Sequence, residues 1–167
     1  EAHTDLVKKL DYECELAVVL GRDARDVPAG QTRDYIFGYT ILNDVSARDV
    51  QTAHKQWYFG KSLDGFTPIG PCIVTADAFA DYPPRLGIRS FVNGEKRQDS
   101  NTALQIFDID HVIAELSQGM TLKAGTIIAT GTPAGVGMGM DPPQFLKPGD
   151  VVRCEIEGIG TLTNPVK

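Results

Sequence analysis

Two glutamates, Glu13 and Glu15, stand one residue apart at the start of an apolar run that continues to Leu20. In an extended strand, residues i and i+2 point to the same side, so the two carboxylates would be neighbours. Neighbouring carboxylates at the edge of an apolar segment repel each other unless a positive group lies between them. A divalent cation is the simplest such group; the alternative is an ordinary solvent-exposed strand face.

A second acidic segment, residues 43–51, follows another apolar run at residues 35–42. Strand ends of this kind bring polar side chains to the margin of a sheet. A carboxylate from this segment could therefore complete a three-oxygen site with the two glutamates, which favours the metal interpretation.

Strand-like segments dominate the chain, and several are bounded by Gly, Pro or Asn. Asn93-Gly94 predicts a two-residue hairpin turn, and residues 158–160 predict a second hairpin. Apolar periodicity predicts a helix at 108–119, and a shorter one is expected at 47–55. The expected fold class is mainly β with a few short helices (α+β), in one domain covering 1–167. The expected strands are 15–20, 36–42, 72–75, 86–92, 126–130, 151–156 and 160–163.

Charge and hydropathy narrow the class of partner. The formal net charge is −6 over 167 residues, and no basic stripe with interleaved aromatic residues is present, so a nucleic-acid groove is not expected. A small molecule is the favoured partner. The sequence has neither an apolar stretch of membrane-spanning length nor a signal sequence, which predicts a cytoplasmic protein.

The cysteines Cys14, Cys72 and Cys154 are odd in number and lack the spacing of a zinc site, so we expect reduced core residues. Cys14 lies between the two glutamates and should point the other way, into packing. Tyr12 and Trp57 are also interpreted as packing residues.

Other catalytic classes fit poorly. Gly60-Lys61-Ser62 lacks the upstream glycine of a phosphate-binding loop, and the glycines at 131–139 are followed by Pro142 and Pro143 rather than by a helix. The sequence has no Gly-x-Ser-x-Gly elbow, and its three histidines, His3, His54 and His111, have no evident nucleophile partner. His111 is expected on the polar face of its helix.

Four separated blocks resemble the fumarylacetoacetate hydrolase family: Asp-Tyr-Glu-x-Glu-Leu-Ala-Val-Val at 11–19, Asn-Asp-Val-Ser-Ala-Arg-Asp-x-Gln at 43–51, Gly-Lys-Ser-x-Asp at 60–64 and Thr-Gly-Thr-Pro-x-Gly-Val-Gly at 130–137. The order and spacing of the blocks agree with the family, and the resemblance runs from about residue 10 to 166. It implies the family's mixed β-sandwich roll.

The resemblance also implies site residues. Glu13, Glu15 and Asp44 match the family's metal-binding carboxylates, and hard oxygen donors select Mg²⁺ or Mn²⁺, with Ca²⁺ as a further candidate. Lys61 matches the active-site lysine. Gln51 and Thr132 match positions that bind substrate in relatives.

By the same resemblance, we expect a metal-dependent hydrolase that cleaves a carbon–carbon bond in a small β-diketo or 2-oxo acid of the acylpyruvate or fumarylpyruvate type. The bond cleavage would leave an enolate whose charge the metal stabilises. Oxaloacetate decarboxylase and 2-hydroxyhepta-2,4-diene-1,7-dioate isomerase are alternatives that share this intermediate. A non-catalytic metal-binding domain is an alternative of another class. A homodimer is the implied assembly.

Some family features are not matched. Relatives that hydrolyse diketo acids carry a histidine and a glutamate on an N-terminal lid, and His3 with Glu1 does not fit that motif. We therefore expect this sequence to lack the N-terminal segment and lid, and no general base is assigned. Arg48 and Asp49 are expected to support the site, with a salt bridge that orients Asp44.

Overall fold

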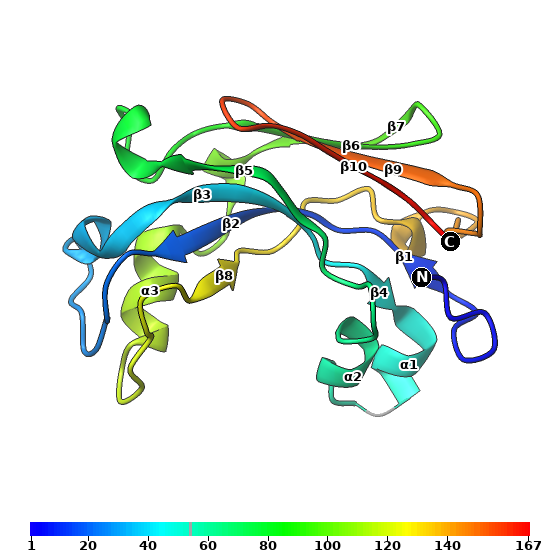
Figure 1. Cartoon of the computed structure of the whole chain (residues 1–167), viewed down its shortest axis with the longest axis horizontal. Helices are drawn as coiled ribbons and strands as arrows, with labels where there is room; N and C mark the ends of the chain where they lie inside the picture. Colours follow the sequence, from blue (N-terminus) through cyan, green and yellow to red (C-terminus); the bar gives the residue numbers. More distant parts are fainter. Residues whose placement is uncertain (54) are drawn as a thin grey trace.

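Two four-stranded antiparallel sheets are the largest regular elements of the molecule (Figure 1). The computed structural model describes residues 1–53 and 55–167; His54 and the expectations that include it lie outside the described residues. One sheet has the order β5-β3-β2-β8, the other has the order β10-β9-β6-β7, and a short pair joins β1 to β4. The strands are β1 (Leu10–Asp11), β2 (Cys14–Leu20), β3 (Ile36–Asn43), β4 (Ser46–Ala47), β5 (Ile69–Thr75), β6 (Gly87–Val92), β7 (Glu95–Asn101), β8 (Ile127–Ala129), β9 (Val151–Ile156) and β10 (Gly160–Pro165).

The two four-stranded sheets face each other as layers, and their facing side chains form the core. Every residue of β2 is buried, and every residue except Glu15 is apolar, which suits a strand covered on both faces. Cys14, Leu16 and Val18 alternate on the face that belongs to the core. Residues Glu13 and Glu15 alternate with them, so their side chains lie on the opposite face of the same sheet.

Three short α-helices lie in the described part of the chain, α1 (Arg48–Ala53), α2 (Tyr58–Lys61) and α3 (Ile109–Leu116). Asp108 caps α3 by accepting a hydrogen bond from the backbone N–H of His111. The helices α1 and α2 lie together at one end of the molecule, below β4 in Figure 1. Short 3₁₀ turns cover Thr32–Tyr35, Ala76–Ala78, Thr102–Leu104 and Gly137–Gly139.

The expected fold class is confirmed: the protein is mainly β with short helices. Both predicted hairpins form, since β6 pairs with β7 across Asn93-Gly94 and β9 pairs with β10. Both hairpin-turn residues have positive φ, 52° at Asn93 and 84° at Gly94, as this turn requires. All pairings among the described strands are antiparallel.

Two packing expectations are wrong. Trp57 is 63% exposed just before α2, and Cys72 lies exposed on β5. The expected burial of Cys72 is not found because β5 is an edge strand of its sheet and is mostly exposed along its length. Tyr12 and Cys14 are buried as expected.

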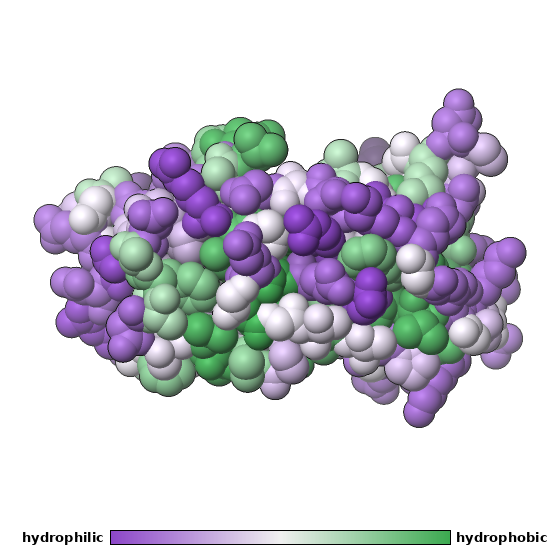
Figure 2. Space-filling model, turned by 90° about the horizontal axis from the view of Figure 1, so that it is seen from above, coloured by the Kyte–Doolittle hydropathy of each residue, from purple (hydrophilic) through white to green (hydrophobic). Residues whose placement is uncertain are grey.

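The face seen from above carries mostly hydrophilic residues with hydrophobic patches between them (Figure 2). None of the helices in the part of the chain that the structure describes is long and apolar enough to cross a membrane.

Candidate metal centre

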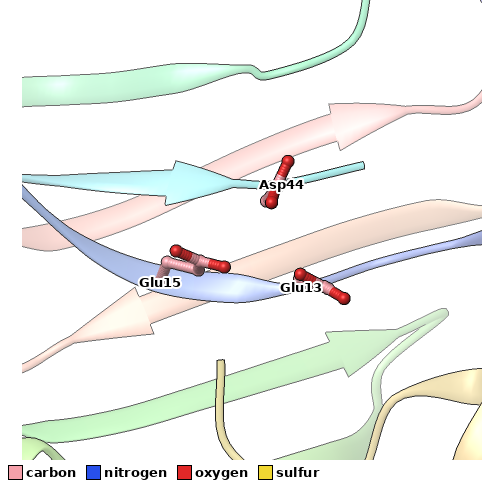
Figure 3. A group of neighbouring side chains, drawn as sticks. All are labelled: Glu13, Glu15 and Asp44. Carbon is pink, nitrogen blue, oxygen red and sulfur yellow. The ribbon is translucent and has the colours of Figure 1, made fainter. Parts of the chain in front are cut away.

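Three carboxylates converge at one end of β2 and β3 (Figure 3). Glu13 immediately precedes β2, Glu15 is the second residue of β2, and Asp44 follows the last residue of β3. One carboxylate oxygen from each residue lies within 4.8 Å of the others. This is the three-oxygen cluster that the sequence predicted, and its donors are of the hard type that Mg²⁺, Mn²⁺ and Ca²⁺ accept.

Strand pairing explains why the three side chains meet. Cys14 pairs with Asn43 in the antiparallel ladder, so the residues on either side of this pair are neighbours. The Asp44 backbone N–H donates to the Glu13 carbonyl at 2.8 Å, and the Asn43 side chain accepts from the Glu13 N–H at 3.0 Å. These bonds hold the end of β3 against the start of β2.

The glutamates face away from the second sheet. Cys14, between them, is buried in the core with Cys154 of β9, and the neighbouring Cys154 thiol together with burial raises the pKa of the Cys14 thiol. Since successive residues of a strand point to opposite faces, Glu13 and Glu15 point out of the core. The core therefore supplies a rigid support behind the carboxylates.

Two cationic side chains contact the triad. Lys61 Nζ, at the end of α2, donates to Glu13 Oε2 at 3.0 Å and to Asp44 Oδ2. Arg48 Nη1, at the start of α1, lies 2.7 Å from Glu13 Oε1, and its Nε lies 2.9 Å from Asp11 Oδ2. The ion pairs of Arg48 are thus with Glu13 and Asp11, so Arg48 supports Glu13 and not, as expected, Asp44.

The charge balance of this cluster suits a divalent cation. Asp11, Glu13 and Asp44 pair with the side chains of Lys61 and Arg48, and Glu15 lies beside Glu13 and Asp44. Four carboxylates thus accompany two cations, and two negative charges are in excess when all groups are ionised. Excess charge of one sign is costly in a largely buried cluster. A divalent cation would neutralise it, and the donor set therefore fits the group that the sequence implies.

The pKa values reflect the same excess. Burial raises the pKa of Glu15 to about 8, and the carboxylates of Asp44 and Glu13 add to this effect while the Gly131 N–H opposes it. Burial also raises the pKa of Asp44, although Lys61 opposes it. Burial works against the Lys61 ammonium, but Asp44 and Glu13 outweigh this effect and raise the pKa of Lys61.

We predict that the affinity for Mn²⁺ rises with pH. Because the pKa of Glu15 in the metal-free protein is about 8, a cation that binds below this pH must displace a proton. Release of one proton gives an increase of about tenfold in affinity per pH unit between about pH 6 and 8, and a plateau above. Titrations of Mn²⁺ at several pH values measure this slope, and an affinity independent of pH in this range would contradict it.

The raised pKa of Glu15 also determines how the stability of the metal-free protein changes with pH. A carboxyl pKa raised on folding means that the folded state holds the proton more tightly than the unfolded state. This contribution is therefore present below the unfolded pKa of about 4.5 and is lost as the pH rises through about 8. Bound metal should offset the loss.

The glycine-rich segment at 130–137 closes the other side of the triad. The backbone N–H of Gly131 donates to Glu15 Oε2 at 2.8 Å, and the positive φ of Gly131, 93°, favours glycine there. The Thr132 hydroxyl donates to the Cys14 carbonyl at 2.9 Å and accepts from Gln98 Nε2 at 2.8 Å. These bonds attach the segment to β2, and the assignment of Thr132 to substrate binding stays a prediction.

Gln51, the other residue assigned to substrate binding, is buried on α1. Its Oε1 accepts from Arg48 Nη1 at 3.2 Å, which fixes the orientation of the amide. Asp49 Oδ2 accepts from the backbone N–H of Lys8 at 2.8 Å. The role of Gln51 also remains a prediction, while Asp49 contacts the N-terminal segment rather than the triad.

Sequence patterns missed the helix α2, which positions Lys61. The helix has only 4 residues and includes Gly60, so periodicity gives no signal for it. Gly60 allows α2 to approach α1 closely: a Cβ there would lie 2.7 Å from the Gln51 backbone nitrogen and 2.8 Å from its Cα. Glycine at position 60 therefore places Lys61 beside the carboxylates.

We predict that Gly60→Ala lowers the free energy of unfolding by about 1–3 kcal/mol, the usual range for overpacking. The clash is with backbone atoms of Gln51, so no side-chain rotation relieves it. Denaturant unfolding measures the change. Gly139→Ala is the matched control, because its Cβ would meet only Val136 Cγ2 at an ordinary 3.8 Å. Equal effects of the two substitutions would contradict the prediction.

The facing antiparallel sheets and the outward carboxylate triad define a class of β-rich protein with a candidate metal centre. The sequence pattern of the fumarylacetoacetate (FAA) hydrolase C-terminal region matches residues 2–167. The chain belongs to the fumarylacetoacetate hydrolase family.

Individual relatives carry different activities in their names. The chain is 48% identical to the oxaloacetate tautomerase YisK of Bacillus subtilis over 166 residues, which are 99% of this chain and 55% of the relative. A fumarylacetoacetate hydrolase from Exiguobacterium antarcticum is 53% identical with a TM-score of 0.97, over 100% of this chain and 60% of that one. A 2-hydroxyhepta-2,4-diene-1,7-dioate isomerase from Mycobacterium marinum is 46% identical with a TM-score of 0.86, over 96% of this chain and 60% of that one. The chain thus spans little more than half the length of these relatives.

Proposed function

We propose that this chain is the catalytic part of a divalent-metal-dependent enzyme that interconverts the enol and keto forms of a small 2-oxo acid, with oxaloacetate as the first candidate substrate. The observation that carries the proposal is the outward carboxylate triad with a lysine on two of its members. The 48% identity to an oxaloacetate tautomerase supports the choice of substrate. The same activity is proposed for the full-length protein to which this chain belongs.

The reaction moves a proton between an oxygen and a carbon atom and passes through an enolate. A divalent cation, Mg²⁺ or Mn²⁺, when held by Glu13, Glu15 and Asp44, supplies Lewis-acid stabilisation of the enolate charge. Lys61 adds an ammonium beside the triad, where it would hold a substrate oxygen as negative charge develops. Gln51 and Thr132 are proposed to bind the substrate, and the rigid strands β2 and β3 keep the groups in position.

The comparisons favour the isomerisation alternatives over the carbon–carbon hydrolase that we expected first. Hydrolysis needs an activated water in addition to enolate stabilisation. His3 Nε2 bonds the Asp64 carbonyl at 2.7 Å, and His111 stacks on Phe107 with ring centroids 4.8 Å apart. Neither side chain is therefore assigned as a base for water.

A carbon–carbon hydrolase of acylpyruvate type is the second candidate, because the 53% identical protein is named a fumarylacetoacetate hydrolase. A decarboxylase of oxaloacetate and a dienedioate isomerase would use the same carboxylates and lysine.

Product analysis by NMR tests the proposal. The full-length protein is incubated separately with enol oxaloacetate, acetylpyruvate and 2-hydroxyhepta-2,4-diene-1,7-dioate, with Mg²⁺ or Mn²⁺ and with EDTA. Metal-dependent acceleration of the enol-to-keto conversion of oxaloacetate is the expected result. Pyruvate and acetate from acetylpyruvate, with no effect on oxaloacetate, would instead establish the hydrolase, and pyruvate from oxaloacetate would establish the decarboxylase.

A homodimer is proposed as the assembly. Large apolar side chains at Leu104, Ile106 and Phe107 are 74%, 92% and 61% exposed, which supports a contact surface between copies. Sedimentation of the full-length protein at several concentrations should give twice the monomer mass, and a monomer throughout would contradict the proposal.

A further inference from the structure

Asp11, two residues before Glu13, has no role in the proposed chemistry but forms a buried ion pair with Arg48, which also contacts Glu13. Its side chain is 0% exposed, and both of its carboxylate oxygens accept backbone hydrogen bonds. Oδ1 accepts from the N–H of Tyr12 at 2.9 Å and of Gly137 at 2.7 Å, and Oδ2 accepts from the N–H of Met138 at 2.9 Å. A carboxylate with fixed donors on both oxygens is held in one orientation.

Arg48 connects Asp11 to the triad. Its side chain is 5% exposed, its Nε donates to Asp11 Oδ2 at 2.9 Å, and its Nη1 contacts Glu13 Oε1 at 2.7 Å. Because the guanidinium is rigid and planar, anchoring Nε on Asp11 determines where Nη1 points. Glu13 then has Oε1 held by Arg48, while its Oε2 accepts from Lys61 Nζ at 3.0 Å.

Gly137 shows how closely the loop and Asp11 fit. A Cβ at Gly137 would lie 2.8 Å from Asp11 Oδ1 and 2.0 Å from the Gln144 carbonyl oxygen. The loop that contacts Glu15 through Gly131 therefore reaches Asp11 at its other end. Asp11 links this loop to the arginine that holds Glu13.

We propose that Asp11 is a positioning residue for the metal centre: it orients Arg48, and Arg48 orients the carboxylate of Glu13 as a ligand. The inference rests on the metal centre of the proposed function. Partners that orient a metal ligand change metal affinity by about 10- to 100-fold when they are replaced. Because Asp11 is proposed to act through Arg48, the effects of replacing the two residues should not add.

The test is Mn²⁺ binding by the full-length protein, followed through the electron paramagnetic resonance of free Mn²⁺. We expect Asp11→Asn and Arg48→Met each to weaken binding by about 10- to 100-fold, and the double variant to bind no more weakly than Arg48→Met alone. Asp99→Asn is the control for loss of an ion-paired aspartate, since Asp99 pairs with Arg89 and Lys96 on the exposed β6-β7 hairpin. It should bind Mn²⁺ as the unmodified protein does.

Two further variants distinguish loss of the positioning role from misfolding and from absence of the metal centre. Arg48→Lys retains a cation but cannot bridge Asp11 and Glu13 in the same geometry, so it should weaken binding even if Asp11→Asn fails to fold. Glu13→Gln tests the metal centre itself. Loss of binding in Glu13→Gln with normal binding in the folded Asp11 and Arg48 variants would overturn the positioning role alone. Normal binding in Glu13→Gln would overturn the metal centre.

A merely structural role for Asp11 predicts a different pattern. The unfolding temperature of the metal-free protein would then fall in Asp11→Asn. The losses of Mn²⁺ affinity in the two single variants would add in the double variant. Additive losses would contradict the inference, because they would mean that Asp11 affects the metal centre independently of Arg48.

Discussion

Asp44→Asn is expected to abolish metal-dependent turnover and to weaken Mn²⁺ binding by more than about 100-fold. The amide keeps the shape of the side chain but removes one of three anionic donors, and a hard cation depends on such donors. Lys61 would keep its contact with Glu13, and the Asp44 backbone bond to β2 does not involve the side chain. The fold should therefore survive.

Calorimetric titration with Mn²⁺ and an oxaloacetate tautomerisation assay measure the two effects of Asp44→Asn. Asp34→Asn is the control, since the Asp34 side chain is 82% exposed and makes only a 3.8 Å pair with Arg22. The control should retain affinity and rate. Metal-dependent turnover retained in Asp44→Asn would contradict the assignment of Asp44 as a ligand.

Lys61→Met is expected to lower the turnover rate by about 100- to 1,000-fold, the usual effect of removing one group that stabilises a developing oxyanion. Metal binding should be unchanged or tighter, because the Lys61 ammonium no longer shares the oxygens of Glu13 and Asp44. The two measurements together separate a ligand from a residue that acts on the substrate.

The same variant discriminates between an enzyme and a non-catalytic metal domain. Tighter metal binding in Lys61→Met agrees with both classes, so the rate decides: in a purely structural site, neither the unmodified protein nor Lys61→Met should turn over any of the three substrates. Lys123→Met is the control, since Lys123 pairs at 2.7 Å with the exposed Asp23. A full rate in Lys61→Met would contradict the role of Lys61 in the reaction.

The sequence was sufficient to predict the strands that carry the triad, because β2 and β3 have long apolar runs and their acidic residues stand at the ends. Alternation along a strand correctly predicted that Glu13 and Glu15 face one side and Cys14 the other. Antiparallel pairing of Cys14 with Asn43 then adds Asp44 to the pair, a step that depends on the register between distant strands.

The parts that the sequence did not predict depend on tertiary contacts. The helix α2 is too short for periodicity, and its position follows from a close contact between Gly60 and Gln51. The choice of Glu13 and Asp11 as the partners of Arg48 depends on how α1 meets β2. Neither relation lies within one segment of the chain, so no local pattern reports it.

We propose that Glu13, Glu15 and Asp44 hold a divalent cation to which a 2-oxo acid binds. The most direct test is a crystal structure of the full-length protein with Mn²⁺ and oxalate, an analogue of the enolate, with anomalous scattering used to locate the metal. We predict one Mn²⁺ at coordination distance from all three carboxylates, with oxalate chelating it beside Lys61. Mn²⁺ bound elsewhere, or oxalate bound away from the triad, would contradict the proposed metal centre.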